Sequence, residues 1–223
     1  PLDTIEALAW GSNLDWGFSK HPPFSAFAVE IFYFIFGSQD WAYYLLSQIF
    51  VIISFIYVWK LSLEIFQEKI YSLLSLLALE SIFYFNFTTP EFNVNVSQLP
   101  FWALTVFYFW KSIQSNKLQN WLLFGIFSAL GFLSKYLFIY VLFATFLFLL
   151  FDFNKNKRFF KNYFLSVFVS FIIVIPHFIW LFKNNFTTIN YGLNRSSLIS
   201  VEVIDYLLNP LTFIFKQFFI LIP

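Results

Sequence analysis

The chain has 223 residues, of which 60% are hydrophobic, 26% aromatic and only 11% charged. Soluble domains carry about 25% charged residues, so this composition is typical of an integral membrane protein. The net charge of +1 excludes the strongly basic surface that nucleic-acid binding needs. The absence of cysteine excludes disulfides, thiolate metal sites and cysteine nucleophiles.

Apolar runs along the chain predict an all-α, polytopic transmembrane protein, since a helix needs about 20 mostly apolar residues to cross the hydrocarbon core. Pro23–Phe36 is shorter than that and carries Glu30, so we expect a helix that lies at the membrane interface. A polar break at Ser134–Lys135–Tyr136 is expected to divide the longest run into two helices. The predicted crossings are Tyr43–Leu63, Ile70–Phe87, Val96–Ile113, Trp121–Phe151 (as two helices), Tyr163–Phe182 with a kink near Pro176, and Tyr206–Ile222.

The predicted loops differ in charge from one side of the membrane to the other. When the spans alternate in direction, Leu61–Lys69, Lys111–Asn120 and Asp152–Asn162 share one side, and that side carries most of the basic residues. Basic loops stay in the cytoplasm, so we assign this side to the cytoplasm. Residues 1–42 then form an outer loop.

Four outer segments carry the residues that suit chemistry. Asp3 and Glu6 are three apart, so they share one face of a helix. Lys20–His21 precede two prolines, Glu91 lies in a polar loop between two spans, and Lys135 lies at the helix break. Carboxylates suit an acceptor hydroxyl that must lose a proton, and lysines suit a phosphate. Together they predict a site for a lipid-linked phosphosugar.

The motifs in these segments follow one another in a recognisable order: Asp3–Trp10, Leu14–Gly17, Lys20–Phe24, Asp40–Ala42, Phe87–Asn93 and Leu133–Tyr136. This ordered set resembles the bacterial GT-C membrane glycosyltransferases, in particular the glycosyltransferase family 39, protein-mannosyltransferase-like and RgtA/B/C/D-like enzymes. The resemblance implies that residues 1–223 are the N-terminal part of one GT-C transmembrane domain. Residues 1–42 would be an outer loop with an interfacial helix and residues 43–223 transmembrane spans, with further spans before Pro1 and after Pro223.

The resemblance also implies an activity. Enzymes of this kind, in EC class 2.4, take a hexose or pentose from a polyprenyl-phosphate donor and pass it, usually with inversion, to an acceptor. The acceptor is a lipid (as in lipopolysaccharide), a glycan or a protein of the cell envelope. The reaction takes place on the periplasmic or outer face of the bacterial cytoplasmic membrane. The expected partners are therefore the donor, the acceptor and membrane lipids, with no nucleic acid.

By the same resemblance Asp3, Glu6 and Glu91 are the catalytic acids, with Asp3 the first choice for the base. Lys20 or His21, together with Lys135, would bind the donor phosphate. Many relatives have Asp directly before Glu and Lys directly before the two prolines. This chain departs from both patterns, which leaves the base divided between Asp3 and Glu6 and one phosphate ligand divided between Lys20 and His21.

Other interpretations of these residues stay open. Asp3 and Glu6 also suit the first turn of any helix, and Glu91 suits the start of a helix near Phe92. Lys135 could reach the head groups from a helix end. No cofactor is assigned, and a divalent metal held by Asp3, Glu6, Glu91 or His21 is left open. The alternative functions are a transporter or flippase of lipid-linked sugars, and a non-catalytic scaffold subunit.

Overall fold

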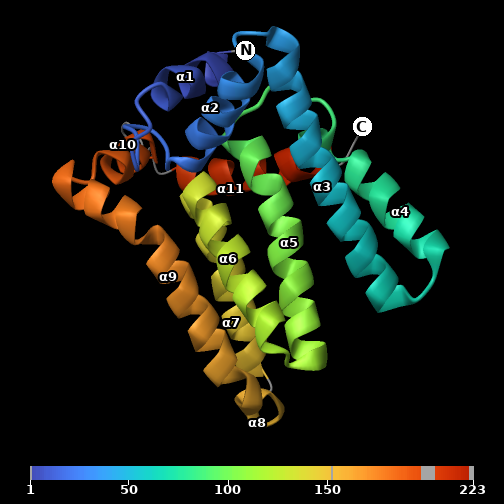
Figure 1. Cartoon of the computed structure of the whole chain (residues 1–223). Coiled ribbons are helices and arrows are strands. Elements are labelled where there is room, and N and C mark those ends of the chain that lie inside the picture. Colours follow the sequence, from blue (N-terminus) through green and yellow to red (C-terminus); the bar gives the residue numbers. More distant parts are fainter. Residues whose placement is uncertain (1, 152, 197–203, 221–223) are drawn as a thin grey trace.

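The computed structural model describes residues 2–151, 153–196 and 204–220. These residues form helices and connecting turns without any strand, which confirms the all-α prediction. The long helices run as a bundle, with α1, α2 and α10 gathered at one end (Figure 1). The α-helices are α1 Leu2–Gly11, α2 Phe24–Phe36, α3 Asp40–Phe66, α4 Lys69–Glu80, α5 Val94–Ser115, α6 Leu118–Ser134, α7 Ile139–Phe151, α8 Phe153–Asn156, α9 Phe160–Lys183, α10 Thr187–Ser196 and α11 Asp205–Ile220.

Two helical stretches are long and apolar enough to cross a membrane. The first is α3, whose 27 residues extend about 40 Å. The second is the 31-residue stretch 153–183 that ends with α9. Large apolar side chains point outward along the bundle, as Phe143 (59% exposed) and Phe171 (54% exposed) illustrate. A surface of this kind is stable against lipid tails and unstable against water, so the fold is that of an integral membrane protein.

The predicted crossing Ile70–Phe87 is different in the structure. Its helix, α4, has 12 residues and ends at Glu80, so it extends about 18 Å and does not span the hydrocarbon core by itself. The Ser81 N–H still donates to the Leu77 carbonyl, and the chain leaves the helix at Ile82, whose backbone is extended (φ −76°, ψ 125°). A short 3₁₀ turn, Phe83–Phe85, follows.

The break predicted at Ser134–Lys135–Tyr136 is confirmed. Helix α6 ends at Ser134, Lys135 has an extended backbone (φ −161°, ψ 133°), and a 3₁₀ turn over Tyr136–Phe138 leads into α7. The break places Lys135 at the end of the bundle that also holds α1 and α2 (Figure 1).

Small residues allow α6 and α9 to approach closely. A Cβ added at Gly125 would lie 2.5 Å from the Ser166 carbonyl oxygen, so only glycine fits there. The Ser170 hydroxyl donates a hydrogen bond of 2.6 Å to the Gly125 carbonyl. Small residues and hydroxyl hydrogen bonds are the usual means of helix association in membranes. This contact fixes α9, which in turn holds part of the loop between α1 and α2.

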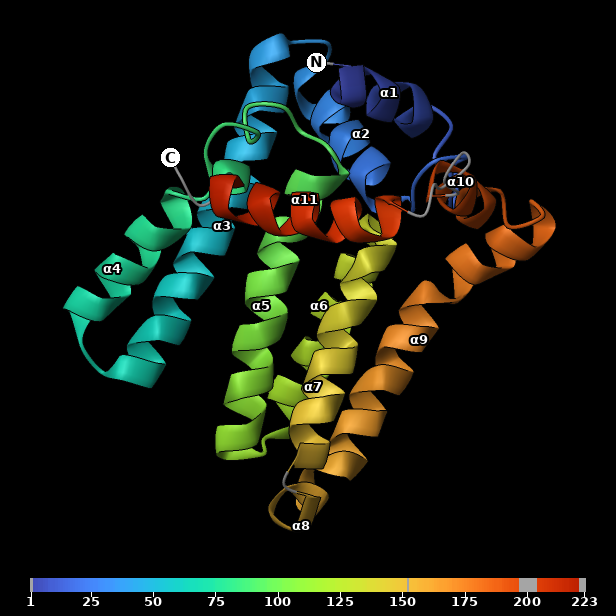
Figure 2. The ribbon, with the colours of Figure 1, turned by 180° about the vertical axis from the view of Figure 1, so that it is seen from behind.

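Several connections between helices lie together at one end of the bundle. The α3–α4 and α5–α6 connections and α8 lie on the side opposite α1 and α2 (Figure 2). These are the segments that the sequence grouped as the basic loops. Helix α11 runs across α5 and α6 in both views instead of alongside them, and its described side chains are exposed (Figures 1 and 2). The predicted crossing Tyr206–Ile222 is therefore not parallel to the others, and residues 221–223 lie outside the described residues.

Candidate active site

Asp3 and Glu6, two of the three predicted catalytic acids, lie on α1. The start of this helix is held by the loop that carries Glu91. The carboxylate of Glu91 accepts hydrogen bonds from the backbone N–H groups of Asp3 (2.8 Å) and Thr4 (3.4 Å). The Thr4 hydroxyl donates to the Phe92 carbonyl at 3.0 Å. The first N–H groups of a helix have no partner within it and favour a negative charge, so Glu91 stabilises α1 from outside.

Glu91 thus has a role that the sequence did not give it. The open alternative was that it caps a helix beginning near Phe92, but Asn93 caps that helix, α5, by accepting from the N–H groups of Asn95 and Val96. Glu91 instead orients α1, and its side chain lines a separate hollow beside Thr88 and Asn95.

This cap leads to a first prediction. Replacing Glu91 with Ala removes the partner of two N–H groups, which costs roughly 0.5–2 kcal/mol of helix stability. We expect faster hydrogen exchange at the amides of Asp3 and Thr4, measured by mass spectrometry on the intact protein. Glu91→Gln keeps an acceptor oxygen and should restore most of the protection. Equal exchange in the wild type and Glu91→Ala would contradict the cap.

Glu6 and Lys20 form an ion pair. The Lys20 Nζ donates to the Glu6 Oε1 at 2.5 Å, with both side chains partly exposed. This hydrogen bond raises the pKa of Lys20, so the amine stays charged. By contrast, the Asp3 carboxylate has no ion-pair or hydrogen-bond partner among the described residues. Of the two acids, Asp3 therefore has the carboxylate that is available to a substrate.

His21 is partly buried next to Lys20, with Asp3, Glu6 and Lys135 close enough to act on its charge. Its ring meets the edge of Trp10, with ring centroids 5.8 Å apart. Burial lowers the pKa of His21 below its ordinary value of 6.5, because desolvation disfavours the charged ring. The ring is therefore neutral at pH 7, which distinguishes it from Lys20.

Lys135 is fixed by a residue that the sequence did not single out. Its Nζ donates a hydrogen bond of 2.5 Å to the Asn95 Oδ1. Burial lowers the pKa of Lys135, and the nearby charge of Arg195 lowers it further. The only sequence signal for Asn95 is its place in the first turn of α5, two residues after the cap Asn93.

These segments line one cavity of about 630 Å³ at the end of the bundle. Five of the six predicted site residues line it, and Glu91 does not. The cavity is lined by Asp3, Glu6, Lys20, His21, Pro22, Val94, Asn95, Lys135, Tyr136, Leu137, Thr188, Tyr191, Gly192 and Arg195. Four of these, Thr188, Tyr191, Gly192 and Arg195, come from α10, a helix that the apolar runs of the sequence did not predict. Among the described residues, no group of three or more His, Asp or Glu side chains is placed to hold a metal ion.

The loop that carries Lys20 and His21 is anchored to α9 and α10. The His177 Nδ1–H donates to the Trp16 carbonyl at 2.5 Å, so its Nε2 accepts from the Tyr136 hydroxyl at 2.7 Å. The His177 ring therefore joins α9 to the 3₁₀ turn that holds Tyr136 and to the loop that holds Trp16. The Trp180 indole N–H also donates to Asp15 at 2.7 Å. These bonds join the α1–α2 loop, the helix break and α9.

The anchor leaves no room for a side chain at Gly17. A Cβ there would lie 2.3 Å from a ring carbon of Trp180. We expect Gly17→Ala to destabilise the protein by roughly 1–3 kcal/mol, because overpacking forces the loop off α9. Thermal unfolding tests this, with Gly192→Ala as the control, since a Cβ at Gly192 meets no atom within 4 Å. Equal losses in the two variants would contradict the tight anchor.

Comparison with known proteins identifies the family. The family model of dolichyl-phosphate-mannose-protein mannosyltransferases matches residues 20–180. The chain belongs to this family. Searches of curated proteins and of solved structures each gave no match.

Family membership makes the chain a glycosyltransferase of the GT-C type, which uses a polyprenyl-phosphate sugar as donor within a membrane. The matched segment includes Lys20, His21, Glu91 and Lys135. Asp3 and Glu6 precede it, so their place in this glycosyltransferase rests on the geometry of the cavity.

Proposed function

We propose that this glycosyltransferase moves a hexose or pentose from polyprenyl phosphate to a lipid, glycan or protein of the bacterial envelope, with inversion, on the outer face of the cytoplasmic membrane. The observation that carries the proposal is the shared cavity. It combines a free carboxylate, that of Asp3, with the cations Lys20, Lys135 and Arg195. Transfer from a sugar phosphate needs both kinds of group, a base for the acceptor and positive charge at the leaving phosphate.

Asp3 is the proposed base. It takes the proton of an acceptor hydroxyl while that oxygen attacks the anomeric carbon. The bond between that carbon and the phosphate oxygen breaks, and polyprenyl phosphate leaves with the electron pair. Attack from the side opposite the leaving group inverts the anomeric centre, as in inverting glycosidases. Glu91 is a positioning residue in this scheme, because it holds the backbone of Asp3.

Lys135 and Arg195 are the proposed phosphate ligands. The hydrogen bond to Asn95 orients the Lys135 amine without neutralising it, because Asn95 has no charge. Burial strengthens the attraction between this amine and a phosphate, since the local dielectric is low. Lys20 is already paired with Glu6, so its contribution is to the positive field of the cavity and to the position of Glu6.

An apolar hollow of about 390 Å³ is the proposed binding site of the prenyl chain of the donor. Its lining residues include Phe24, Phe27, Phe32 and Leu133. Phe24 follows His21 by three residues, and Leu133 precedes Lys135 by two. A lipid tail in this hollow would leave its phosphate close to the charged cavity, and its burial would contribute roughly 25 cal/mol per Å².

The charge of His21 decides whether it can bind the donor phosphate as Lys135 is proposed to do. Above its lowered pKa the ring is neutral, and it gains charge only as the pH falls through that value. We therefore expect His21→Asn to change the donor KM less than threefold at pH 7.5, in an assay of sugar transfer. A loss as large as that of Lys135→Ala would show that a charged His21 binds the phosphate.

A transporter or flippase is the second candidate, because the same charges could bind a lipid-linked sugar without reaction. The geometry favours transfer, since a binding site for an anionic donor has no need of the free Asp3 carboxylate. A scaffold subunit would need none of these charges.

Mass analysis of envelope lipids, glycans and proteins from cells with and without the intact gene tests the proposal. We expect one sugar to disappear from one class of acceptor when the gene is removed. Identical envelopes would contradict transfer. Accumulation of the lipid-linked donor on the cytoplasmic side, with cells that carry Asp3→Asn behaving as wild type, would favour the flippase.

A further inference from the structure

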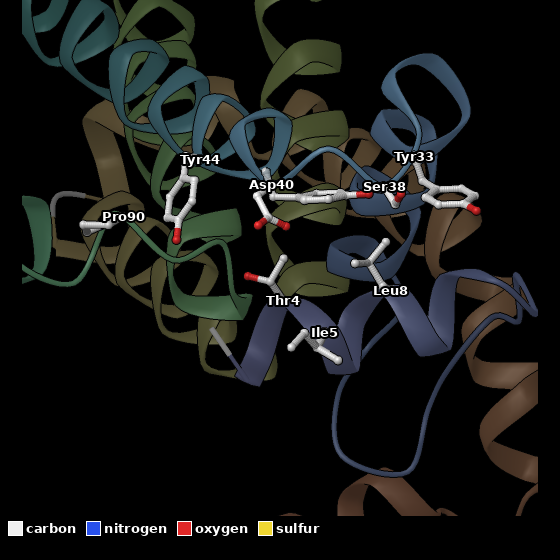
Figure 3. A pocket seen from close by; sticks show the side chains of 9 residues that line it. Thr4, Ile5, Leu8, Tyr33, Ser38, Asp40, Tyr44 and Pro90 are labelled. Carbon is white, nitrogen blue, oxygen red and sulfur yellow. The ribbon is translucent and has the colours of Figure 1, made fainter.

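A second cavity is lined by Thr4, Ile5 and Leu8 of α1 (Figure 3), whereas Asp3 and Glu6 of the same helix line the charged cavity. Its volume is about 370 Å³, within the range of roughly 300–1,000 Å³ that small-molecule sites occupy. Helix α1 forms one wall, and the start of α3 forms the opposite wall (Figure 3). The lining residues are Thr4, Ile5, Leu8, Tyr33, Ser38, Asp40, Tyr43, Tyr44 and Pro90.

The two walls differ in chemistry. Ile5 and Leu8 present apolar side chains from α1, while Asp40 and Tyr44 project toward them from α3 (Figure 3). The Tyr33 and Tyr44 rings are both 46% exposed. Asp40 has no ion-pair or hydrogen-bond partner among the described residues, so its carboxylate is free to accept hydrogen bonds from a ligand.

Tyr43 gives the cavity a rigid base. Its side chain is only 7% exposed, and its hydroxyl donates a hydrogen bond of 2.8 Å to the Gly37 carbonyl. Gly37 has a positive φ of 67°, which ends α2 and turns the chain toward α3. The turn carries Ser38 into the lining. The cavity is thus built on two packed helices and a fixed turn.

This combination of groups selects a class of ligand. Among the described residues that line the cavity, Asp40 is the only charged one, and it is an acid, so a phosphate or another anion is repelled. A lipid tail would leave the Asp40 carboxylate buried without a partner, which costs free energy. A neutral sugar ring satisfies both walls, because its C–H faces bury against aromatic and aliphatic side chains while its hydroxyls donate to a carboxylate.

We propose that this cavity is a subsite for a neutral pyranose ring of the acceptor, which makes the acceptor a glycan or a glycolipid. This inference rests on the proposed function. Thr4, in the lining, directly follows Asp3, so both cavities are lined by α1. Pro90, also in the lining, directly precedes Glu91, whose carboxylate holds the start of α1. An acceptor held here by one ring can extend past the start of α1 to the Asp3 carboxylate. Binding energy from this remote ring orients the reacting hydroxyl.

The competing explanation for Tyr33 and Tyr44 is an aromatic belt at the head-group level, where tyrosine is common. A belt residue binds no sugar, and it has no need of a carboxylate opposite an apolar helix face. The two explanations therefore give opposite results in a binding experiment.

The experiment is saturation-transfer NMR on the intact protein in lipid nanodiscs, which avoid sugar-based detergents. The probes are the methyl α-pyranosides of glucose, mannose and galactose. We expect at least one probe to receive saturation from the wild type. Asp40→Asn and Tyr44→Leu should each weaken its binding about tenfold, since each removes a contact to the ring. Tyr71→Leu is the matched control, because Tyr71 is 48% exposed but lies on α4, outside the cavity.

The outcomes separate this inference from the proposed function. Asp3→Asn should bind the probe as the wild type does, because the measurement needs no catalysis. Failure of sugar transfer together with intact probe binding would overturn the enzyme proposal alone. Absence of saturation on all three probes, or equal binding in the wild type, Asp40→Asn and Tyr44→Leu, would overturn the subsite and leave the tyrosines as belt residues.

Discussion

Asp3→Asn is expected to abolish sugar transfer while the protein still folds and inserts. The substitution removes a general base, and such groups contribute about 10²–10⁴-fold to rate. Folding should be little affected, because the Asp3 contact that holds α1 is made by its backbone N–H and not by its carboxylate. We expect kcat to fall by at least 100-fold with the donor KM changed little, in a transfer assay with polyprenyl-phosphate sugar.

Two controls locate the effect. Glu6→Gln should cost less than Asp3→Asn, because the Glu6 carboxylate is already engaged by Lys20. Glu64→Gln removes a carboxylate that pairs with Lys111 at the opposite side of the bundle, and transfer should stay at the wild-type level. If Glu6→Gln lowers sugar transfer more than Asp3→Asn does, the base is Glu6, and Asp3 is an ordinary first-turn acid.

Lys135→Ala is expected to weaken donor binding. A hydrogen bond between charged groups contributes about 1.5–3 kcal/mol, so the donor KM should rise roughly 10-fold to 100-fold. Asn95→Ala should have a smaller effect in the same direction, because the Lys135 amine remains but loses the partner that orients it. Steady-state kinetics at varied donor concentration measures both.

The matched control for Lys135 is Lys111→Ala. Lys111 also makes one hydrogen bond from its amine, to Glu64, but it lies with the basic loops and away from the cavity. Its loss should leave the donor KM unchanged. A wild-type donor KM in Lys135→Ala would remove Lys135 from the phosphate site and support a lysine that merely reaches the head groups.

The sequence predicted those features that depend on local pattern. The break at Lys135 follows from a polar tripeptide within an apolar run, and the structure has it at the same residues. The segment Pro23–Phe36, for which a short helix was expected, becomes α2 with nearly the same bounds. The i, i+3 spacing of Asp3 and Glu6 places both acids in the lining of one cavity. These features need only the helical period and the length of an apolar run.

Features that depend on contacts between segments far apart in the chain could not be predicted from the sequence pattern. The role of Glu91 depends on where α1 begins, 88 residues away in the chain. The Asn95–Lys135 bond joins residues 40 apart. Helix α10 was missed because its ten residues are too few and too polar for a membrane crossing. It is held against the first loop by the Thr188 hydroxyl, which donates to the Phe18 carbonyl.

Whether the donor is cleaved in this cavity is the central question, and one measurement answers it. Proteoliposomes holding the wild type or Asp3→Asn are incubated with a polyprenyl-phosphate sugar and an envelope extract from cells lacking the gene. Mass spectrometry then quantifies free polyprenyl phosphate. We expect the wild type to release it in step with glycosylated acceptor, and Asp3→Asn to release none above the protein-free background. Intact donor moved across the bilayer without release of polyprenyl phosphate, equally in both proteins, would contradict the account.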